Sequence, residues 1–280
     1  MTLDLSSFES AVYGASEGRH GSFFTLRSDN YVSRSIERYG EWCEAELTLL
    51  AQVIEPGDVV VDAGANIGTH TLAFANMVGP GGRVYAFEPQ PVVHRALSAN
   101  ILINGATQAI ALNAALGDAP GALGFAEIDY GVERNFGAVS LEIVRDLAAR
   151  DVAGPKASIP IMRLDDAVSV SRLKLIKSDT EGMEAALLDG ASETLGRLKP
   201  YLYLECETAT AAAPLFEAVE RHGYDAFWHI APLYLANNWK NDPEDVFGGV
   251  ACVNLFCAPK GQGVKGLTKA EGAASHPRGA

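Results

Sequence analysis

Acidic side chains stand at or just past the ends of several predicted strands. They are Asp62, Glu88, Asp118, Asp179 and Glu205. In a parallel sheet these ends share one edge, and ligands bind in the crevice outside it. A carboxylate there can hold a cation, accept hydrogen bonds from sugar hydroxyls or remove a proton. A surface without function would place fewer acids at one edge, so we expect the chemistry there.

The turn at residues 62–68 follows a short apolar run at residues 59–61. This run consists of β-branched valines and is too brief for a helix, so it predicts a buried parallel strand. Gly64, Asn66 and Gly68 then lead into a helical pattern that begins with THTL. A strand, a turn with glycines and a helix leave room for a nucleotide cofactor at the carboxyl end of the strand.

The carboxylate of Asp62 helps to distinguish among nucleotide cofactors. A dinucleotide fold needs the spacing G-x-G-x-x-G and aims a helix N-terminus at a pyrophosphate, which this carboxylate would repel. S-adenosylmethionine instead carries an ammonium and a sulfonium, which a carboxylate attracts. Glu88 ends the next predicted strand, where it can accept hydrogen bonds from both ribose hydroxyls. We therefore expect S-adenosylmethionine between Asp62 and Glu88.

Asp179 and Glu181 follow a predicted strand at residues 173–177, where a helix is expected to begin near residue 181. Two interpretations stay open. The pair can cap the helix and interact with its positive end. Alternatively, Asp179 faces the cofactor pocket while Glu181 shapes the turn.

Other candidate site residues lie on three further predicted strands. Asn113 and Asp118, at the end of a strand at residues 109–116, would face the base of the cofactor if the sheet is doubly wound. Glu205 ends a fifth strand. His229, on a sixth strand, is the best-placed candidate for a base near neutral pH, although a histidine among apolar residues is more often a core group.

The composition limits the class of protein. The chain has 280 residues, of which 48% are hydrophobic, enough for one well-buried domain. No apolar run approaches the roughly 18 residues that span a bilayer, and the N-terminus lacks the features of a signal peptide. The net charge of −13 argues against nonspecific binding to nucleic acid or to an anionic membrane. We expect a small-molecule or glycan acceptor as partner, and a homo-oligomer is compatible with the sequence.

Four cysteines, Cys43, Cys206, Cys252 and Cys257, form no C-x-x-C pair. They are expected to be buried and reduced rather than to form a metal site, which favours a cytoplasmic location. From residue 41 a helical pattern continues to Pro56, and Glu46 is expected on its solvated face.

The chain divides into three parts. Residues 1–40 form an N-terminal extension with one strand-like piece at 22–27. Residues 41–259 form the main domain, whose strands and helices alternate. Residues 121–163 break this alternation, as an insertion that covers the site or as an ordinary surface excursion. The tail at 260–280 is rich in glycine, lysine and alanine and is expected to be disordered.

From about residue 41 to residue 259 the chain resembles the FkbM family of S-adenosylmethionine-dependent methyltransferases. The resemblance implies an α/β fold of the class I methyltransferase, Rossmann-like type, with a seven-stranded, mostly parallel sheet, an antiparallel last strand and helices on both faces. It also implies O-methylation of a hydroxyl of a sugar, glycan or natural product. The motifs that carry it are VVDAGANIGTHTL, VYAFEPQP, NFGAVSL, IKSDTEGME with LLDGA, YLYLECE, and FWHIAPLY with NLFCAP.

The resemblance assigns roles only where the motifs match. Asn66 stands where the general methyltransferase turn has its middle glycine, but it fits the pattern of this family. Cys206 departs from the asparagine expected after Glu205. The matching residues are Asp62, Gly64, Asn66 and Gly68 for the donor-binding turn, Glu88 for the ribose acid, and Asp179 with Glu181 for the family's D-x-E-G.

Methyl transfer to a hydroxyl requires removal of its proton, so we expect a base. Asp179 or His229 is expected to serve, with Glu205 assisting. These three side chains suit Mg²⁺ only in part, because histidine is a softer ligand, and dependence on a divalent metal stays open.

Two other functions share part of this pattern. An NAD-dependent oxidoreductase would have the same turn and Glu88, but Asp62 and the glycine spacing disfavour it. A noncatalytic nucleotide-binding protein would keep the turn and would not need the acids near Asp179.

Overall fold

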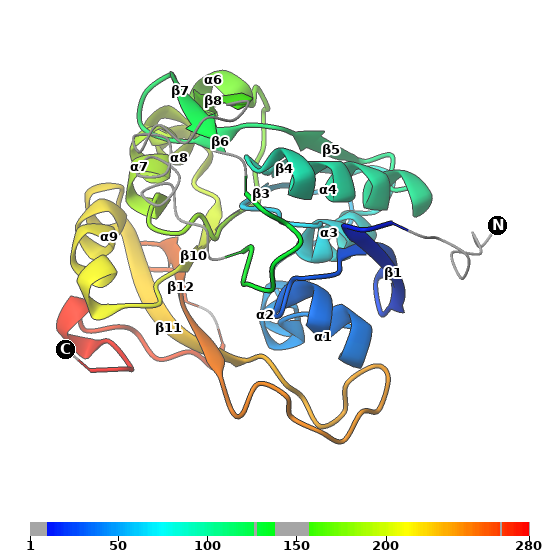
Figure 1. Cartoon of the computed structure of the whole chain (residues 1–280). Helices are drawn as coiled ribbons and strands as arrows, with labels where there is room; N and C mark the ends of the chain where they lie inside the picture. The colour runs from blue at the N-terminus through cyan, green and yellow to red at the C-terminus, as the bar shows by residue number, and fades with distance from the viewer. Residues whose placement is uncertain (1–9, 126–127, 138–156, 264, 280) are drawn as a thin grey trace.

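The computed structural model describes residues 10–125, 128–137, 157–263 and 265–279. Its centre is a seven-stranded sheet in the order β11-β12-β10-β9-β3-β4-β5 (Figure 1). Neighbouring strands from β10 to β5 are parallel, whereas β12 is antiparallel to both β10 and β11. This arrangement confirms the expected class I methyltransferase fold. The strands are β3 (Val59–Ala63), β4 (Arg83–Phe87), β5 (Ala109–Leu112), β9 (Leu175–Ser178), β10 (Tyr201–Glu205), β11 (Tyr224–Pro232) and β12 (Ala251–Pro259).

Helices cover both faces of the sheet. Successive strand residues point to opposite sides, so each face presents apolar side chains to the helices. Val60 and Leu175 pack with α2 and α3, whereas Val61 and Ile176 pack with α7, α8 and α9. Among the described residues, no helix has both the length and the apolar character needed to cross a bilayer. The helices are α1 (Val32–Tyr39), α2 (Glu44–Leu50), α3 (Thr69–Val78), α4 (Pro91–Ile103), α6 (Leu164–Ala167), α7 (Glu184–Asp189), α8 (Ser192–Leu198) and α9 (Ala209–Arg221).

The N-terminal residues that the structure describes form a hairpin and a helix. β1 (Tyr13–Gly18) pairs antiparallel with β2 (Gly21–Leu26), which corresponds to the strand predicted at 22–27. Asn100, fully buried in α4, accepts a hydrogen bond from Phe24 N at 2.6 Å and donates to Phe24 O at 3.0 Å. It also donates to Ile67 O at 2.8 Å. This side chain therefore ties the hairpin to α4 and to the turn after β3.

The predicted insertion at residues 121–163 lies partly outside the described residues, which omit 126–127 and 138–156. In its described part, β7 (Gly121–Phe125) pairs antiparallel with β8 (Ala157–Met162). β8 also pairs parallel with β6 (Ala115–Leu116), and the three strands form a separate sheet.

The expectation that the tail at residues 260–280 is disordered is wrong for its described part. The tail runs along β11 and α9, drawn in red in Figure 1. Trp228 Nε1 donates to Ser275 Oγ at 2.9 Å, and His276 Nε2 donates to Cys206 O at 2.9 Å. Lys269 also pairs with Asp225. Composition indicated no order, because only scattered polar contacts and three apolar side chains, Leu267, Ala270 and Ala273, hold this segment against the core.

The helix predicted from residue 41 begins later, as α2, because Cys43 has a left-handed backbone with φ 47°. The expected solvated position of Glu46 on this helix is wrong. Its side chain is buried and is hydrogen-bonded to His70 Nε2 at 3.0 Å and to Asn254 Nδ2 at 2.9 Å. Helical periodicity identifies the apolar side of α2, but it does not show that α3 and β12 also approach its acidic side.

The three hydrogen bonds that Asn100 makes to Phe24 and Ile67 predict that its removal lowers the free energy of unfolding. Replacing Asn100 with Ala leaves the buried backbone groups of Phe24 and Ile67 without these partners, which costs about 1–3 kcal/mol. Urea unfolding followed by circular dichroism measures the loss. The exposed Asn76→Ala is the control and is expected to change stability by less than about 0.5 kcal/mol. Equal losses of unfolding free energy in the two variants would show that Asn100 does not hold the hairpin and the turn together.

Candidate functional site

A cleft of about 400 Å³ lies at the carboxyl ends of β3, β4, β9 and β10. A smaller cavity of about 50 Å³ shares several of its lining residues, among them Gly64 and Glu88. Three of the acids predicted at separate strand ends, Glu88, Asp179 and Glu205, therefore meet at one place. The predicted site residues that line the cleft are Gly64, Asn66, Glu88, Asp179, Glu181 and Glu205.

The turn after β3 consists of residues that tolerate a left-handed backbone. Gly64 (φ 73°) lies so close to the end of β9 that a Cβ would be 1.7 Å from the carbonyl oxygen of Asp179. Asn66 (φ 50°) accepts a hydrogen bond from Ile67 N through its own Oδ1 at 2.7 Å. Asparagine tolerates this conformation better than most residues, which explains why it can stand in the place of a glycine. Gly68 (φ 93°) is the residue before α3.

Glu88 follows β4 with its carboxylate held at the cleft. The carboxylate accepts hydrogen bonds from Asn66 N at 3.0 Å and Gln90 N at 2.8 Å. Burial raises the pKa of Glu88 to about 7, although these two bonds oppose the shift. Asn113 is outside the described lining of the cleft, and its Nδ2 donates to the carbonyls of Glu88 and Pro89 at 2.8 and 3.0 Å. Asn113 therefore positions Glu88.

Asp62 has a different environment from the one predicted. It is fully buried, and its Oδ2 accepts a hydrogen bond from Thr71 Oγ1 at 2.6 Å. The ammonium of Lys177 lies 3.5 Å from Asp62 Oδ1 and 3.4 Å from Asp179 Oδ2. Burial alone would lower the pKa of Lys177, but the two carboxylates raise it overall, so the side chain is charged. The expected direct pairing of Asp62 with a cationic cofactor is thus corrected, because Lys177 supplies the opposite charge.

Asp179, Glu181 and Glu205 form what we call the acid cluster. One carboxylate oxygen from each lies within 4.8 Å of the others. The turn that carries two of them is held by Glu184, whose carboxylate accepts from Thr180 N at 2.7 Å and from Thr180 Oγ1 at 2.8 Å. Because α7 begins only at Glu184, Asp179 and Glu181 lie before its first turn, and the capping interpretation does not hold.

The acid cluster cannot be fully ionised, because like charges this close repel one another. Burial and the neighbouring Asp179 raise the pKa of Glu181 to about 8. The same two causes raise the pKa of Glu205 well above its ordinary value. Both shifts favour the protonated form of these two acids, while Asp179 lies beside the ammonium of Lys177. Oxygen ligands of this kind also suit Mg²⁺ or Ca²⁺, so the cluster is able to hold a divalent cation.

Two predicted site residues lie away from the cleft. Asp118 is exposed, because after Leu112 the chain leaves the main sheet and enters β6. His229 Nδ1 is hydrogen-bonded to Tyr203 Oη at 2.8 Å, outside the described lining of the cleft, and burial lowers its pKa. The interpretation of His229 as a satisfied core group therefore fits better than a catalytic one. Cys206 is buried in the core, so its departure from the family pattern does not alter the described cleft lining.

Other residues of the cleft were missed by the sequence analysis. Gln90 Nε2 donates to Phe136 O at 2.7 Å, and the motif VYAFEPQP contained this signal. Arg278 pairs with Glu207 and donates to Ala251 O at 2.6 Å, but no pattern distinguished it within the tail. Further lining residues are Tyr31, Trp42, His70, Lys177, Leu233, Val250 and Cys252.

Comparison with known proteins adds to this geometry. The model of the methyltransferase FkbM domain matches residues 62–226. The chain is 31% identical over 203 residues to the 31-O-demethyl-FK506 methyltransferase FkbM of Streptomyces tacrolimicus, over 65% of this chain and 78% of the relative. It is 29% identical over 190 residues to the methyltransferase sdnD of Sordaria araneosa, over 59% of this chain and 73% of the relative. Among solved structures, M. jannaschii TYW2 in complex with AdoMet aligns with a TM-score of 0.43 and 16% identity, over 89% of this chain and 87% of that one.

The buried ion pair predicts a large effect of removing Lys177. The Lys177→Met variant leaves the carboxylate of Asp62 buried without its opposite charge, and we expect a loss of about 3–5 kcal/mol in the free energy of unfolding. Lys174→Met is the matched control, because Lys174 pairs with Asp58 at 3.8 Å near the surface, where such a pair contributes about 0–1 kcal/mol. Urea unfolding measures the free energy of unfolding of both variants. Similar losses in the two would show that the buried Asp62 does not need the charge of Lys177.

Proposed function

Because this chain belongs to the FkbM family of S-adenosylmethionine-dependent methyltransferases, we propose that it methylates a hydroxyl of a sugar, glycan or natural product. The observation that carries the proposal is the arrangement of acids around one cleft, with Glu88 after β4 and the acid cluster after β9 and β10. The name of the relative from Streptomyces tacrolimicus specifies an O-demethyl compound, which supports a hydroxyl as acceptor.

The residues of the cleft fit the cofactor of this family. Each carboxylate oxygen of Glu88 accepts one backbone N–H and keeps a lone pair for a ribose hydroxyl. The acid cluster lines the same cleft as Glu88, so its carboxyl oxygens can accept hydrogen bonds from the ammonium of the donor. When bound, S-adenosylmethionine supplies a methyl group on a positively charged sulfur.

Asp179 is the residue of the cluster best suited to remove the proton of the acceptor. Burial and neighbouring carboxylates raise the pKa of Glu181 and of Glu205. The carboxylate of Asp179 instead lies 3.4 Å from the ammonium of Lys177 and lines the cleft. A proton on Glu205 can form a hydrogen bond to Asp179 and orient it. We therefore assign the base to Asp179 and the supporting role to Glu205. A divalent cation held by the same carboxylates is the alternative way to activate the hydroxyl.

The partners and the location are also proposals. The acceptor is a small molecule or a glycan, and not a nucleic acid or a membrane, as the net charge of −13 supports. The four free thiols support a cytoplasmic location.

The affinity for the cofactor is expected to depend on pH through the ionisation of Glu88. The ionised carboxylate accepts hydrogen bonds from hydroxyls better than the protonated one, and its pKa is about 7. Affinity for S-adenosylhomocysteine is therefore expected to fall about tenfold as the pH drops from 8 to 6. Titration calorimetry measures this fall, and NAD is expected to give no heat.

Two variants separate Glu88 from the other acids in this titration. In Glu88→Gln the affinity is weaker and this part of the pH dependence is lost, whereas the exposed Glu55→Gln behaves as the wild type. Heat with NAD alone would instead indicate an oxidoreductase. Binding of S-adenosylhomocysteine without methyl transfer to any acceptor would indicate the noncatalytic protein.

If Asp179 is the base, replacing it should lower turnover much more than it lowers the affinity for the cofactor. Asp179→Asn is expected to lower kcat by about 10²–10⁴, while affinity for S-adenosylhomocysteine changes only a few fold. Glu205→Gln is expected to have a smaller effect, and His229→Asn to stay within a few fold of the wild type. Transfer from a methyl-labelled donor to a panel of hydroxylated sugars and natural products provides the measurement. Activity that a chelator abolishes and Mg²⁺ restores would show that the acid cluster acts through a cation.

A further inference from the structure

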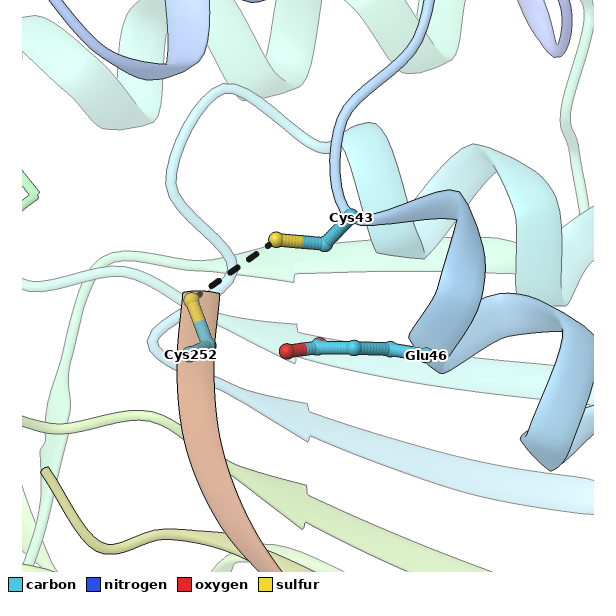
Figure 2. A group of neighbouring side chains, drawn as sticks. All are labelled: Cys43, Glu46 and Cys252. Atoms are coloured by element: carbon cyan, nitrogen blue, oxygen red, sulfur yellow. Dashed lines mark hydrogen bonds between the residues drawn. The ribbon is translucent and has the colours of Figure 1, made fainter. Parts of the chain in front are cut away.

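Two cysteines and a glutamate meet where α2 approaches β12 (Figure 2). Cys43 Sγ lies 3.9 Å from Cys252 Sγ, although 209 positions separate the two residues. One carboxylate oxygen of Glu46 lies within 4.8 Å of both sulfurs. Cys43 and Glu46 are buried, and Cys252 lines the cleft. The site described above uses neither Cys43 nor Glu46.

We propose that Cys43, Cys252 and Glu46 bind a divalent transition-metal cation of the zinc class. In a tetrahedral zinc site, two thiolates about 2.3 Å from the ion lie about 3.8 Å apart. The observed distance between the sulfurs matches this value, so α2 and β12 already have the separation that the ion requires. The thiolates also favour zinc over Mg²⁺ or Ca²⁺, which oxygen-only sites such as the acid cluster suit better.

The surroundings of Glu46 hold its carboxylate in the orientation of a ligand. Its Oε2 is hydrogen-bonded to His70 Nε2 and its Oε1 accepts from Asn254 Nδ2. Ligating carboxylates in metal sites are fixed by such outer partners. Each oxygen has a further lone pair for a cation. The buried position of Glu46, which the helical pattern did not predict, thus receives an explanation.

Three protein ligands leave the fourth position of a tetrahedral ion for water or for a bound molecule. Cys252 and His70 both line the cleft, so this position faces it. The ion would join α2, which precedes the sheet in sequence, to β12, its last strand. It would therefore fix one side of the cleft. The proposal does not depend on methyl transfer.

A disulfide is the competing use of the two cysteines. It would require the sulfurs to approach to about 2.05 Å and an oxidant to accept two electrons. The carboxylate of Glu46 opposes the thiolate that begins this exchange, because like charges repel. A bound cation offsets that repulsion, since it neutralises the charges of the three ligands while the two thiol protons pass to the solvent. The three side chains together therefore favour the metal.

Cobalt absorption of the full chain tests the site. The protein is reduced with a phosphine under nitrogen, freed of metal with a chelator and titrated with Co²⁺. We expect a thiolate-to-cobalt charge-transfer band in the near ultraviolet that saturates at one ion per chain and disappears when Zn²⁺ is added. Cys43→Ser and Cys252→Ser are each expected to weaken Co²⁺ binding at least a hundredfold. Glu46→Gln is expected to weaken it at least tenfold.

The control is Cys257→Ala, which removes a buried thiol elsewhere on β12 and is expected to keep the band. Circular dichroism checks the fold of each variant. If Cys43→Ser does not fold, the half-buried Cys252 gives the deciding variant. The proposal is overturned if the reduced wild type gives no such band, or if the band persists unchanged in Cys252→Ser. Loss of two thiols to an added disulfide oxidant, without any cobalt band beforehand, would assign the pair to a disulfide.

Discussion

The acid-rich edge of this sheet depends on the buried ion pair between Lys177 and Asp62. All four residues of β9 are buried, so Lys177 stands inside a strand that otherwise packs apolar side chains. Its ammonium lies between Asp62 and Asp179, so Asp62, which has no exposed surface, has an opposite charge 3.5 Å away. Asp62 in turn accepts the hydrogen bond from Thr71 that connects β3 to α3. The geometry of the cofactor turn thus depends on a charge that lies next to it in space and far from it in sequence.

Much of the fold and part of the site could be predicted from the sequence, because the relevant signals are local. Three valines followed by Gly64, Asn66 and Gly68 specify a strand, a turn and a helix within about 20 residues. Each of these turn residues has a positive φ, as their types indicated. Glu88 could be placed for the same reason, since the end of one parallel strand lies beside the end of the next. The antiparallel last strand was implied by the resemblance, and β12 indeed follows β11 with no helix between them.

The errors concern contacts between distant segments. Glu46 was expected in solvent because its own helix gives no sign of Asn254, which lies 208 positions later. His229 was considered as a base because histidine titrates near neutral pH, although its apolar neighbours favoured a core group. Its partner Tyr203 belongs to β10, and no local pattern relates the two. Asp118 was misplaced because β6 pairs with the second sheet and takes the chain away from the cleft. Periodicity describes which side of an element is apolar, but not which element will approach it.

The residues that line the cleft also fall into two groups, those within the stretch that matches the family model and those contributed by distant segments. The turn, Glu88 and all three members of the acid cluster lie within residues 62–226, the stretch that matches the family model. Trp42, Val250 and Arg278 line the cleft from outside that stretch. Enzymes that share a donor and differ in acceptor must differ in the residues that contact the acceptor. We therefore expect selectivity for the acceptor to depend on these outer segments, which the N-terminal helices, β12 and the tail bring to the cleft. The proposed cation site belongs to the same side, since it connects α2 with β12. We therefore expect the part of the cleft that binds the donor to be set by local sequence, and the part that binds the acceptor to depend on how the ends of the chain pack against the sheet.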